Sequence, residues 1–171
     1  KDIRVMYSPV DAIKIAEENP NKEIIFLGIG FETTIPILAI LVQEAEKKQL
    51  NNFSIWMTTK LVKPVLQYII EKGEVSLDGF ILPGHVSIVL GEDSYAYLVD
   101  DYNISGVIGG FEPAEVLSTI SKLIQRAYDG KPAILNDHPM IVTKEGNVVA
   151  QQLMAKYFTS CDEAWRGIGV I

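Results

Sequence analysis

The sequence predicts an α/β fold, a three-layer α/β/α sandwich with a mainly parallel sheet. Apolar runs alternate with helical patterns along most of the chain, and this order is typical of parallel sheets. The run at residues 24–29 is continuously apolar, as in a parallel strand covered on both faces. A hydrophobic content of 48% is enough to form the core of one domain.

Glycine and proline mark the ends of the predicted elements. We expect helices over residues 9–19, 35–48, 62–72, 94–101, 113–129 and 148–158. We expect strands over residues 3–6, 24–29, 53–58, 79–82 and 106–108, and a less regular one over 140–143. This order assigns residues 1–135 to an α/β domain. Residues 136–171 form a C-terminal extension that packs on it or leads to a neighbouring domain.

Composition excludes several classes of partner. A net charge of -7 and a pI near 4.8 argue against nucleic acid and against an anionic membrane. No apolar run approaches the roughly 20 residues that cross a bilayer. Cys161 is the single cysteine, so no intrachain disulfide can form, and we expect a cytoplasmic protein. The chain starts without methionine and stops inside an apolar run, so we also expect a fragment of a longer protein.

Three predicted strands run into polar, glycine-rich turns, at residues 28–34, 82–87 and 109–113. If the strands are parallel, these turns meet at one edge of one sheet, where open α/β sheets bind ligands. The turns carry carboxylates, hydroxyls and a histidine that would then form one candidate site: Glu32, Thr33, Thr34, His85, Ser87 and Glu112. From these residues alone the chemistry of the site stays open.

The first turn partly matches a dinucleotide-binding fingerprint. Gly28 and Gly30 fit, but Thr33 replaces the third glycine, and no acidic residue ends the following strand. The structural alternative is a tight turn allowed by glycine, with a threonine that caps the helix. That alternative explains Glu32 poorly, because a cap needs no carboxylate before it.

The other two turns have similar alternatives. His85 follows Pro-Gly at a strand end and could carry a proton, bind a metal or donate a hydrogen bond, although a lone histidine is more often structural. Glu112 stands at a helix entrance, where capping alone would account for it. His138 has mainly a turn character, and Cys161 is expected to be a bystander. No nucleophile–base pair and no Cys-x-x-Cys metal spacing is present.

Five motifs in order resemble the HypD-type hydrogenase maturation factors. They are Gly-Phe-Glu-Thr-Thr with Pro36, Gly-Phe-Ile-Leu-Pro-Gly-His-Val-Ser with Gly91, Gly-Phe-Glu-Pro, Glu-Gly-Asn and Trp-Arg-Gly-Ile-Gly. Two positions depart from the family pattern. Thr59-Lys60 stands where His-Lys is common, and residues 136–140 read Asn-Asp-His-Pro-Met in place of Asn-Gln-Tyr-Pro-Arg. These departures put local contacts in doubt, not the family.

The resemblance implies a scaffold that helps to assemble the iron centre of nickel–iron hydrogenases, with its cyanide and carbon monoxide ligands. It implies a HypC-type chaperone and a HypE-type cyanide donor as partners, and a [4Fe–4S] cluster in the full-length parent. This chain would cover the second α/β domain and lack the family's cysteine motifs, so no cofactor is expected in the fragment. The matching turns would line the iron-site cleft, with these residues: Glu32, Thr33, Thr34, Lys60, Pro83, Gly84, His85, Ser87 and Glu112.

Other function classes stay open beside the scaffold. The runner-up is a small-molecule or nucleotide-binding domain of an α/β enzyme, and a third class is an interaction module with a structural cleft. The resemblance favours an accessory protein over a stand-alone enzyme. We expect the isolated fragment to fold but not to hold iron or a cluster.

Overall fold

The computed structural model describes residues 2–171 and divides them into two units. Unit 1 comprises residues 2–60 together with Gln152–Ser160. Unit 2 comprises Leu61–Gln151 together with Cys161–Ile171. Each unit has its own core of buried apolar residues.

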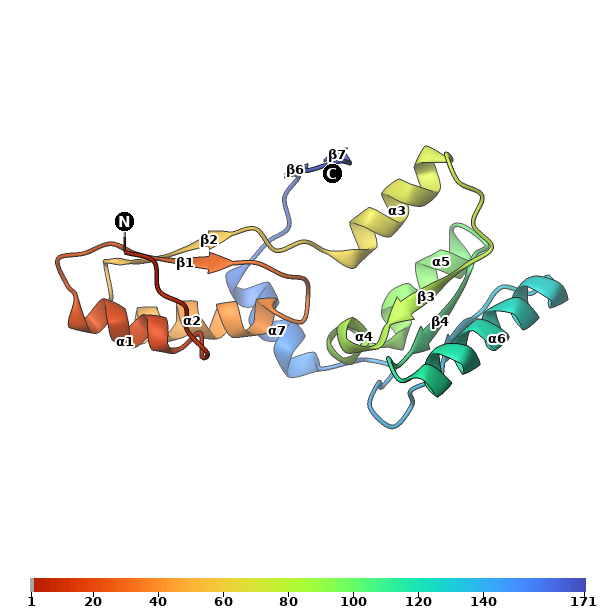
Figure 1. Cartoon of the computed structure of the whole chain (residues 1–171), viewed down its shortest axis with the longest axis horizontal. Coiled ribbons are helices and arrows are strands. Elements are labelled where there is room, and N and C mark those ends of the chain that lie inside the picture. Colours follow the sequence, from red (N-terminus) through yellow and green to blue (C-terminus); the bar gives the residue numbers. More distant parts are fainter. Residues whose placement is uncertain (1) are drawn as a thin grey trace. The chain divides into compact units, whose positions relative to one another are not determined.

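Unit 1 contains a two-stranded parallel sheet with two helices on one of its faces (Figure 1). Its elements are α1 (Asp11–Glu18), β1 (Ile24–Gly28), α2 (Ile35–Lys47) and β2 (Phe53–Met57). The predicted helices and the two apolar strands of this part are therefore confirmed, within a few residues at their ends. The order β1–α2–β2 is a βαβ unit, the connection that parallel strands require.

The core of unit 1 lies between the sheet and these helices. Ile13 of α1 and Leu38 and Leu41 of α2 are fully buried there. Alternate residues of the strands, such as Phe26 and Ile55, pack against them. Side chains in a strand point alternately to its two faces, so every second residue of β1 and β2 faces this core. Asn52 fastens the turn before β2, because its side-chain amide donates to the carbonyl oxygens of Ala16, Asn19 and Lys22.

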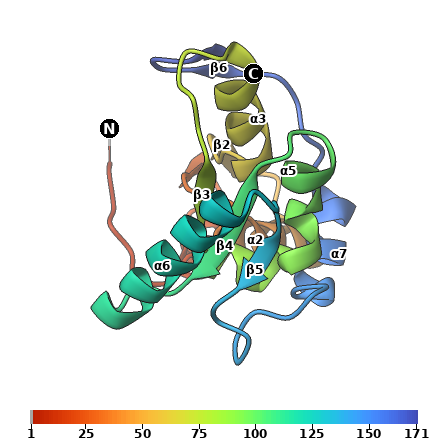
Figure 2. The same ribbon diagram turned by 90° about the vertical axis from the view of Figure 1, so that its right-hand side faces the viewer.

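Unit 2 is built on a three-stranded parallel sheet with the order β3-β4-β5. The strands are β3 (Gly79–Pro83), β4 (Ser105–Gly109) and β5 (Ile134–Asn136). The helices are α3 (Val62–Lys72), α4 (Gly84–Leu90), α5 (Ala96–Asp100) and α6 (Pro113–Asp129), with a 3₁₀ helix over Glu92–Tyr95 before α5. Figure 2 shows α6 on one side of this sheet and α4 and α5 on the other. Unit 2 therefore has the α/β/α layers that the sequence predicts.

All five residues of β4 are buried, as expected for the central strand of a sheet that helices cover on both faces. Ile108 of β4 and Leu82 of β3 belong to the main core of the unit, together with Tyr95 of the 3₁₀ helix and Leu98 of α5. On the α6 side Thr119 is fully buried, and its hydroxyl donates to the carbonyl oxygen of Glu115. The α/β fold class with parallel sheets is thus confirmed.

The C-terminal part has less regular structure. Helix α7 (Val148–Tyr157) begins in unit 2 and ends in unit 1. The chain then returns to unit 2 as a short antiparallel pair, β6 (Ala164–Trp165) and β7 (Gly169–Val170). The structure separates its units after Lys60, and the predicted domain boundary at residue 135 stays a prediction.

One expectation about the sheet is wrong. The sequence predicts one mainly parallel sheet, but within residues 2–171 β1 pairs with β2, and β3, β4 and β5 form a separate sheet. The turn after β1 therefore does not share a sheet edge with the turns after β3 and β4. Apolar periodicity identifies strands, but it does not identify their partners, which depend on contacts between distant residues.

Three local predictions also differ from the structure. Residues 3–6 form no strand, and Ile3 and Val5 are 86% and 93% exposed. Residues 140–143 form a turn instead of a strand, closed by the Val142 N–H, which donates to the carbonyl oxygen of His138. The second neighbour of β4 is β5, over Ile134–Asn136, which is not among the predicted strands. Helix α4 starts within the predicted turn at residues 82–87.

Candidate functional site

The turn after β1 holds a buried carboxylate. Glu32 is only 2% exposed, although it lies in a polar turn between β1 and α2. Gly30 has φ +143°, and a Cβ atom there would lie 2.3 Å from Oγ1 of Thr34, so a glycine is needed at this position. Thr34 occupies the N-cap position of α2 but makes no side-chain cap hydrogen bond, so the capping alternative does not account for Thr34. The turn therefore requires glycine at position 30 and contains a buried acid.

The end of β2 fastens this turn from the side. The Thr58 N–H donates to the carbonyl oxygen of Gly28 at 2.7 Å, and its hydroxyl donates to the same oxygen at 3.1 Å. The Lys60 N–H donates to the carbonyl oxygen of Gly30 at 2.9 Å. The structure therefore brings the backbone of Lys60 to the turn of Glu32, Thr33 and Thr34, and these four predicted residues lie in one region of unit 1.

A second polar region lies at the carboxyl edge of the β3-β4-β5 sheet in unit 2. Because these strands are parallel, the segments that follow them leave from the same edge. Pro83 ends β3, Gly84 and His85 follow it, and Phe111 and Glu112 follow β4. His85 is exposed, and its ring centroid lies 4.7 Å from that of Phe111, which is 63% exposed. The structure thus brings the second and third predicted turns together.

Ser87 does not present its hydroxyl at this edge. It is completely buried, and its Oγ donates to the carbonyl oxygen of Pro83 at 2.9 Å. The same Oγ lies 3.0 Å from the hydroxyl of Tyr95, which is also buried. In this structure Ser87 ties α4 to the 3₁₀ helix over Glu92–Tyr95. Its role is visible as core packing, which the sequence pattern could not distinguish from a site residue.

Glu112 occupies the N-cap position of α6 and is exposed. Its backbone N–H donates to Oε2 of Glu115 at 3.0 Å, as in a capping box. Pro113 follows at the first helical position, where its missing N–H costs nothing. In return, the side chain of Glu112 accepts the backbone N–H of Glu115, so the capping alternative is realised at Glu112.

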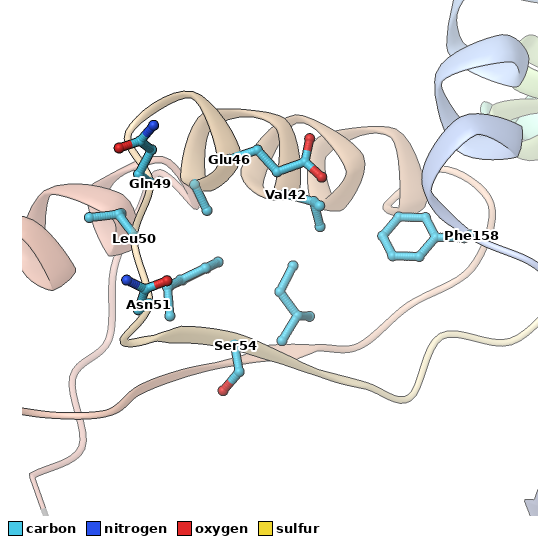
Figure 3. Close-up of a pocket in the computed structure, with 10 residues that line it drawn as sticks. Val42, Glu46, Gln49, Leu50, Asn51, Ser54 and Phe158 are labelled. Carbon is cyan, nitrogen blue, oxygen red and sulfur yellow. The ribbon is translucent and has the colours of Figure 1, made fainter.

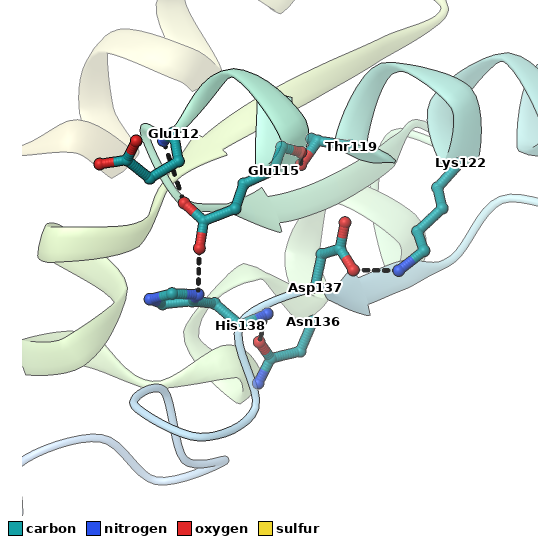
Figure 4. A network of polar contacts seen from close by, with 7 residues as sticks. All are labelled: Glu112, Glu115, Thr119, Lys122, Asn136, Asp137 and His138. Atoms are coloured by element: carbon teal, nitrogen blue, oxygen red, sulfur yellow. Dashed lines mark hydrogen bonds and ion pairs between the residues drawn. The ribbon is translucent and has the colours of Figure 1, made fainter. Parts of the chain in front are cut away.

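A polar network at the same edge was missed by the sequence analysis (Figure 4). It involves the segment after β5, which leaves the sheet beside the start of α6. Nδ1 of His138 lies 3.4 Å from Oε1 of Glu115, and the His138 N–H donates to Oδ1 of Asn136. Lys122 of α6 forms an ion pair with Asp137. A signal was present, since Asn-Asp-His directly follows the apolar residues of β5, the same pattern as the other turns.

The surroundings of Asp137 shift the pKa of its carboxyl group. Burial raises the pKa of its carboxyl group, but hydrogen bonds from Lys122 and Ser118 outweigh burial, with further help from the charge of Lys122. The net effect lowers the pKa of Asp137 below its ordinary value. The side chain of Asp137 is 14% exposed and that of Lys122 is 43% exposed, so the pair lies at the boundary of the core.

Unit 1 also contains a groove of about 600 Å³ between α2 and β2 (Figure 3). Its floor is mainly apolar, with Val42, Leu50, Ile55 and Phe158 among the lining residues. None of the predicted site residues lines this groove. It therefore gives no support to a site at the glycine-rich turns.

Metal-binding side chains do not gather anywhere in residues 2–171. No group of three or more His, Cys, Asp or Glu side chains in this part of the chain could hold a metal ion. Cys161 is exposed. In the same residues, every helix is too short or too polar to span a lipid bilayer.

Comparison with known proteins decides the family. The model of the HypD family, described as "Hydrogenase formation hypA family", matches residues 1–171. The chain belongs to the HypD family. This confirms the resemblance on which the sequence analysis relied, and it accounts for the order of the five motifs.

Curated relatives give the same result. The chain is 38% identical over 171 residues to the hydrogenase maturation factor HypD of Escherichia coli, covering 99% of this chain and 46% of the relative. It is 38% identical over 177 residues to the HypD of Cupriavidus necator, covering 99% and 47%. A putative hydrogenase expression/formation protein of Methanocaldococcus jannaschii is 36% identical over 170 residues, covering 99% and 47%. This HypD-family chain therefore spans about half the length of the curated relatives it matches.

Proposed function

We propose that this chain acts in hydrogenase maturation, as part of a scaffold on which the iron centre of nickel–iron hydrogenases is assembled. The observation that carries the proposal is the match of the HypD family over the whole chain. Relatives named hydrogenase maturation factors support it, with 35–38% identity over 99% of the chain. Because the chain spans about half of these relatives, the activity belongs to the longer parent.

His85 is the residue that we propose for direct contact with the iron centre. Nitrogens of iron-bound cyanide accept hydrogen bonds, and an imidazole N–H can donate one. Exposure of His85 at the carboxyl edge of the β3-β4-β5 sheet supports this role, since a ligand can reach it there. Glu112, exposed at the same edge, would orient a donor of the ligand or of a partner.

The turn of unit 1 supplies a second proposed polar surface. Glu32, Thr33 and Thr34 lie in the turn that Thr58 and Lys60 fasten. A buried carboxylate such as Glu32 orients backbone donors and hydroxyls around it, and we propose that it keeps this turn in shape for ligand contact. This role is tested separately from that of His85.

Iron is the cargo in this proposal and not a resident cofactor of the chain. A [4Fe–4S] cluster takes cysteine thiolate ligands, commonly four. Cys161 is the single cysteine of the sequence, so the residues present do not fit such a cluster. We therefore assign the cluster, and the cysteines that hold the iron, to other parts of the parent. A HypC-type chaperone and a HypE-type cyanide donor are the proposed partners of that parent.

Maturation by the full-length parent tests the proposal. We expect His85→Ala to reduce the yield of active hydrogenase while the melting temperature of the parent stays within a few degrees. Ser121→Ala, at an exposed position of α6 outside the site, is the control and should leave maturation unchanged. Full maturation with His85→Ala would contradict the role of His85. A parent that matures no hydrogenase and retains no HypC-type partner in a pull-down would contradict the scaffold itself.

Glu32→Gln tests the second surface. It removes the charge of the buried carboxyl group and preserves its size, so a loss of maturation without a loss of stability supports a role for the charge. Unchanged maturation would leave Glu32 with a purely structural part in the turn and would contradict the proposal for unit 1.

A further inference from the structure

One face of the β1–β2 sheet is apolar and exposed. Ile25 and Leu27 of β1 are 57% and 58% exposed, and Trp56 of β2 is 65% exposed. Ile29, directly after β1, is 67% exposed. Exposed apolar residues that occur singly are ordinary, but here they are neighbours on two paired strands, with Leu27 opposite Trp56 in the register. These residues make up the outer face of the unit 1 sheet.

The opposite face of the same sheet shows what a covered face looks like here. Phe26, Ile55 and Met57 alternate with the exposed residues along the strands and pack against helix residues such as Leu38. Helices α1 and α2 lie on this inner face (Figure 1). Phe158 after α7 packs against the same core. Helices α1 and α2 therefore pack on the inner face of this sheet.

Topology explains why the outer face is left open. A strand–helix–strand connection between parallel strands is right-handed. When successive strands are added in the same direction across a sheet, their connecting helices therefore all lie on the same face of that sheet. The opposite face is covered by helices of strands that advance the other way, beyond a switch point. Within unit 1, α2 is the helix that connects two paired strands, and it lies on the inner face.

We propose that helices from the part of the parent polypeptide outside residues 1–171 cover the outer face of unit 1. Parallel sheets occur almost only with both faces covered, and a two-stranded sheet is marginally stable alone. The relatives are about twice as long as this chain, so the parent has enough residues to supply the cover. Ile25, Leu27 and Trp56 carry no charge, so an apolar helix face fits them better than a charged partner does. The inference rests on the family and not on the iron-site proposal.

Trp56 gives a direct measurement. Hydroxyl-radical footprinting with mass spectrometry reads its oxidation in the parent and in the 171-residue chain at the same concentration. We expect Trp56 to oxidise several-fold more slowly in the parent. Tyr128 of unit 2, which is 88% exposed, is the internal control and should oxidise at a similar rate in both. Equal rates for Trp56 in the two proteins would overturn the proposal.

Protection of Trp56 already in the 171-residue chain would also overturn the proposal. If the protection of Trp56 grew with protein concentration, a second copy of the chain would cover the outer face. If it did not, another part of the same chain would cover it. A variant adds an independent measurement: Leu27→Lys should lower the melting temperature of the parent and leave that of the 171-residue chain almost unchanged. Tyr128→Lys is the matched control, with no loss in either. An equal effect of Leu27→Lys on both proteins would contradict the proposal.

Discussion

Replacing Ser87 by alanine tests whether this residue serves the core or the candidate site. In the structure its hydroxyl donates to the carbonyl oxygen of Pro83 at 2.9 Å and lies 3.0 Å from the hydroxyl of Tyr95. Both side chains are almost completely buried, so water cannot replace the lost oxygen without entering the core. We therefore expect Ser87→Ala to lower the free energy of unfolding.

The size of the effect follows from the two contacts. A buried hydrogen bond contributes about 1 kcal/mol, and a buried polar group that loses its partner costs about 1–3 kcal/mol. Removing the hydroxyl affects both the Pro83 carbonyl and the Tyr95 hydroxyl, so we expect a loss of about 2–3 kcal/mol. Alanine leaves little extra space, because only one oxygen atom is deleted, so a cavity contributes little to this figure.

Urea unfolding followed by circular dichroism measures the change, and Tyr95→Phe completes a double-mutant cycle. If the two hydroxyls interact, the loss in the double variant should be smaller than the sum of the single losses by about 1 kcal/mol. Ser121→Ala, at an exposed position of α6, is the matched control and should cost less than about 0.5 kcal/mol. A Ser87→Ala protein with unchanged stability and impaired maturation would refute the core assignment and return Ser87 to the candidate site.

Three further predictions concern the edge of the β3-β4-β5 sheet. Asp137→Asn should lower the free energy of unfolding by about 1–2 kcal/mol near pH 7. Because the fold lowers the pKa of Asp137, this difference should be present above about pH 4 and disappear as the pH falls below that value. Urea unfolding at a series of pH values measures it. Gly84→Ala places a Cβ 2.6 Å from the carbonyl oxygen of Gly109, so the free energy of unfolding should fall by about 1–3 kcal/mol in a thermal unfolding experiment. An unchanged stability would show that the two backbone segments can move apart freely. Glu115→Ala removes the side chain that accepts the Glu112 N–H in the capping box, so the free energy of unfolding should fall by about 0.5–2 kcal/mol. The amide hydrogens in the first turn of α6 should also exchange faster with solvent, and unchanged exchange would contradict the cap.

Local sequence patterns predicted much of the fold. Helix α6 shows why: its apolar residues recur at helical spacing, Pro113 stands at its start and Gly130 closes it with φ +61°. The continuous apolar run of β1, followed by a helical pattern and the apolar-rich run of β2, also indicated parallel strands joined by a helix. These features are written in residues a few positions apart, so they can be recognised before any tertiary contact is known. The ordered motifs indicated the HypD family for the same reason.

Only the tertiary structure decided which turns belong together and what their side chains do. The turn of Glu32 belongs to one sheet and that of His85 to another, because strand pairing depends on contacts between distant residues. Ser87 and His85 lie two positions apart in α4, yet the side chain of Ser87 is buried and that of His85 is exposed. His138, which looked like a turn residue, contacts Glu115 across 23 positions of sequence. Sequence determined the residue types available at each strand end, and packing selected the ones that a ligand can reach.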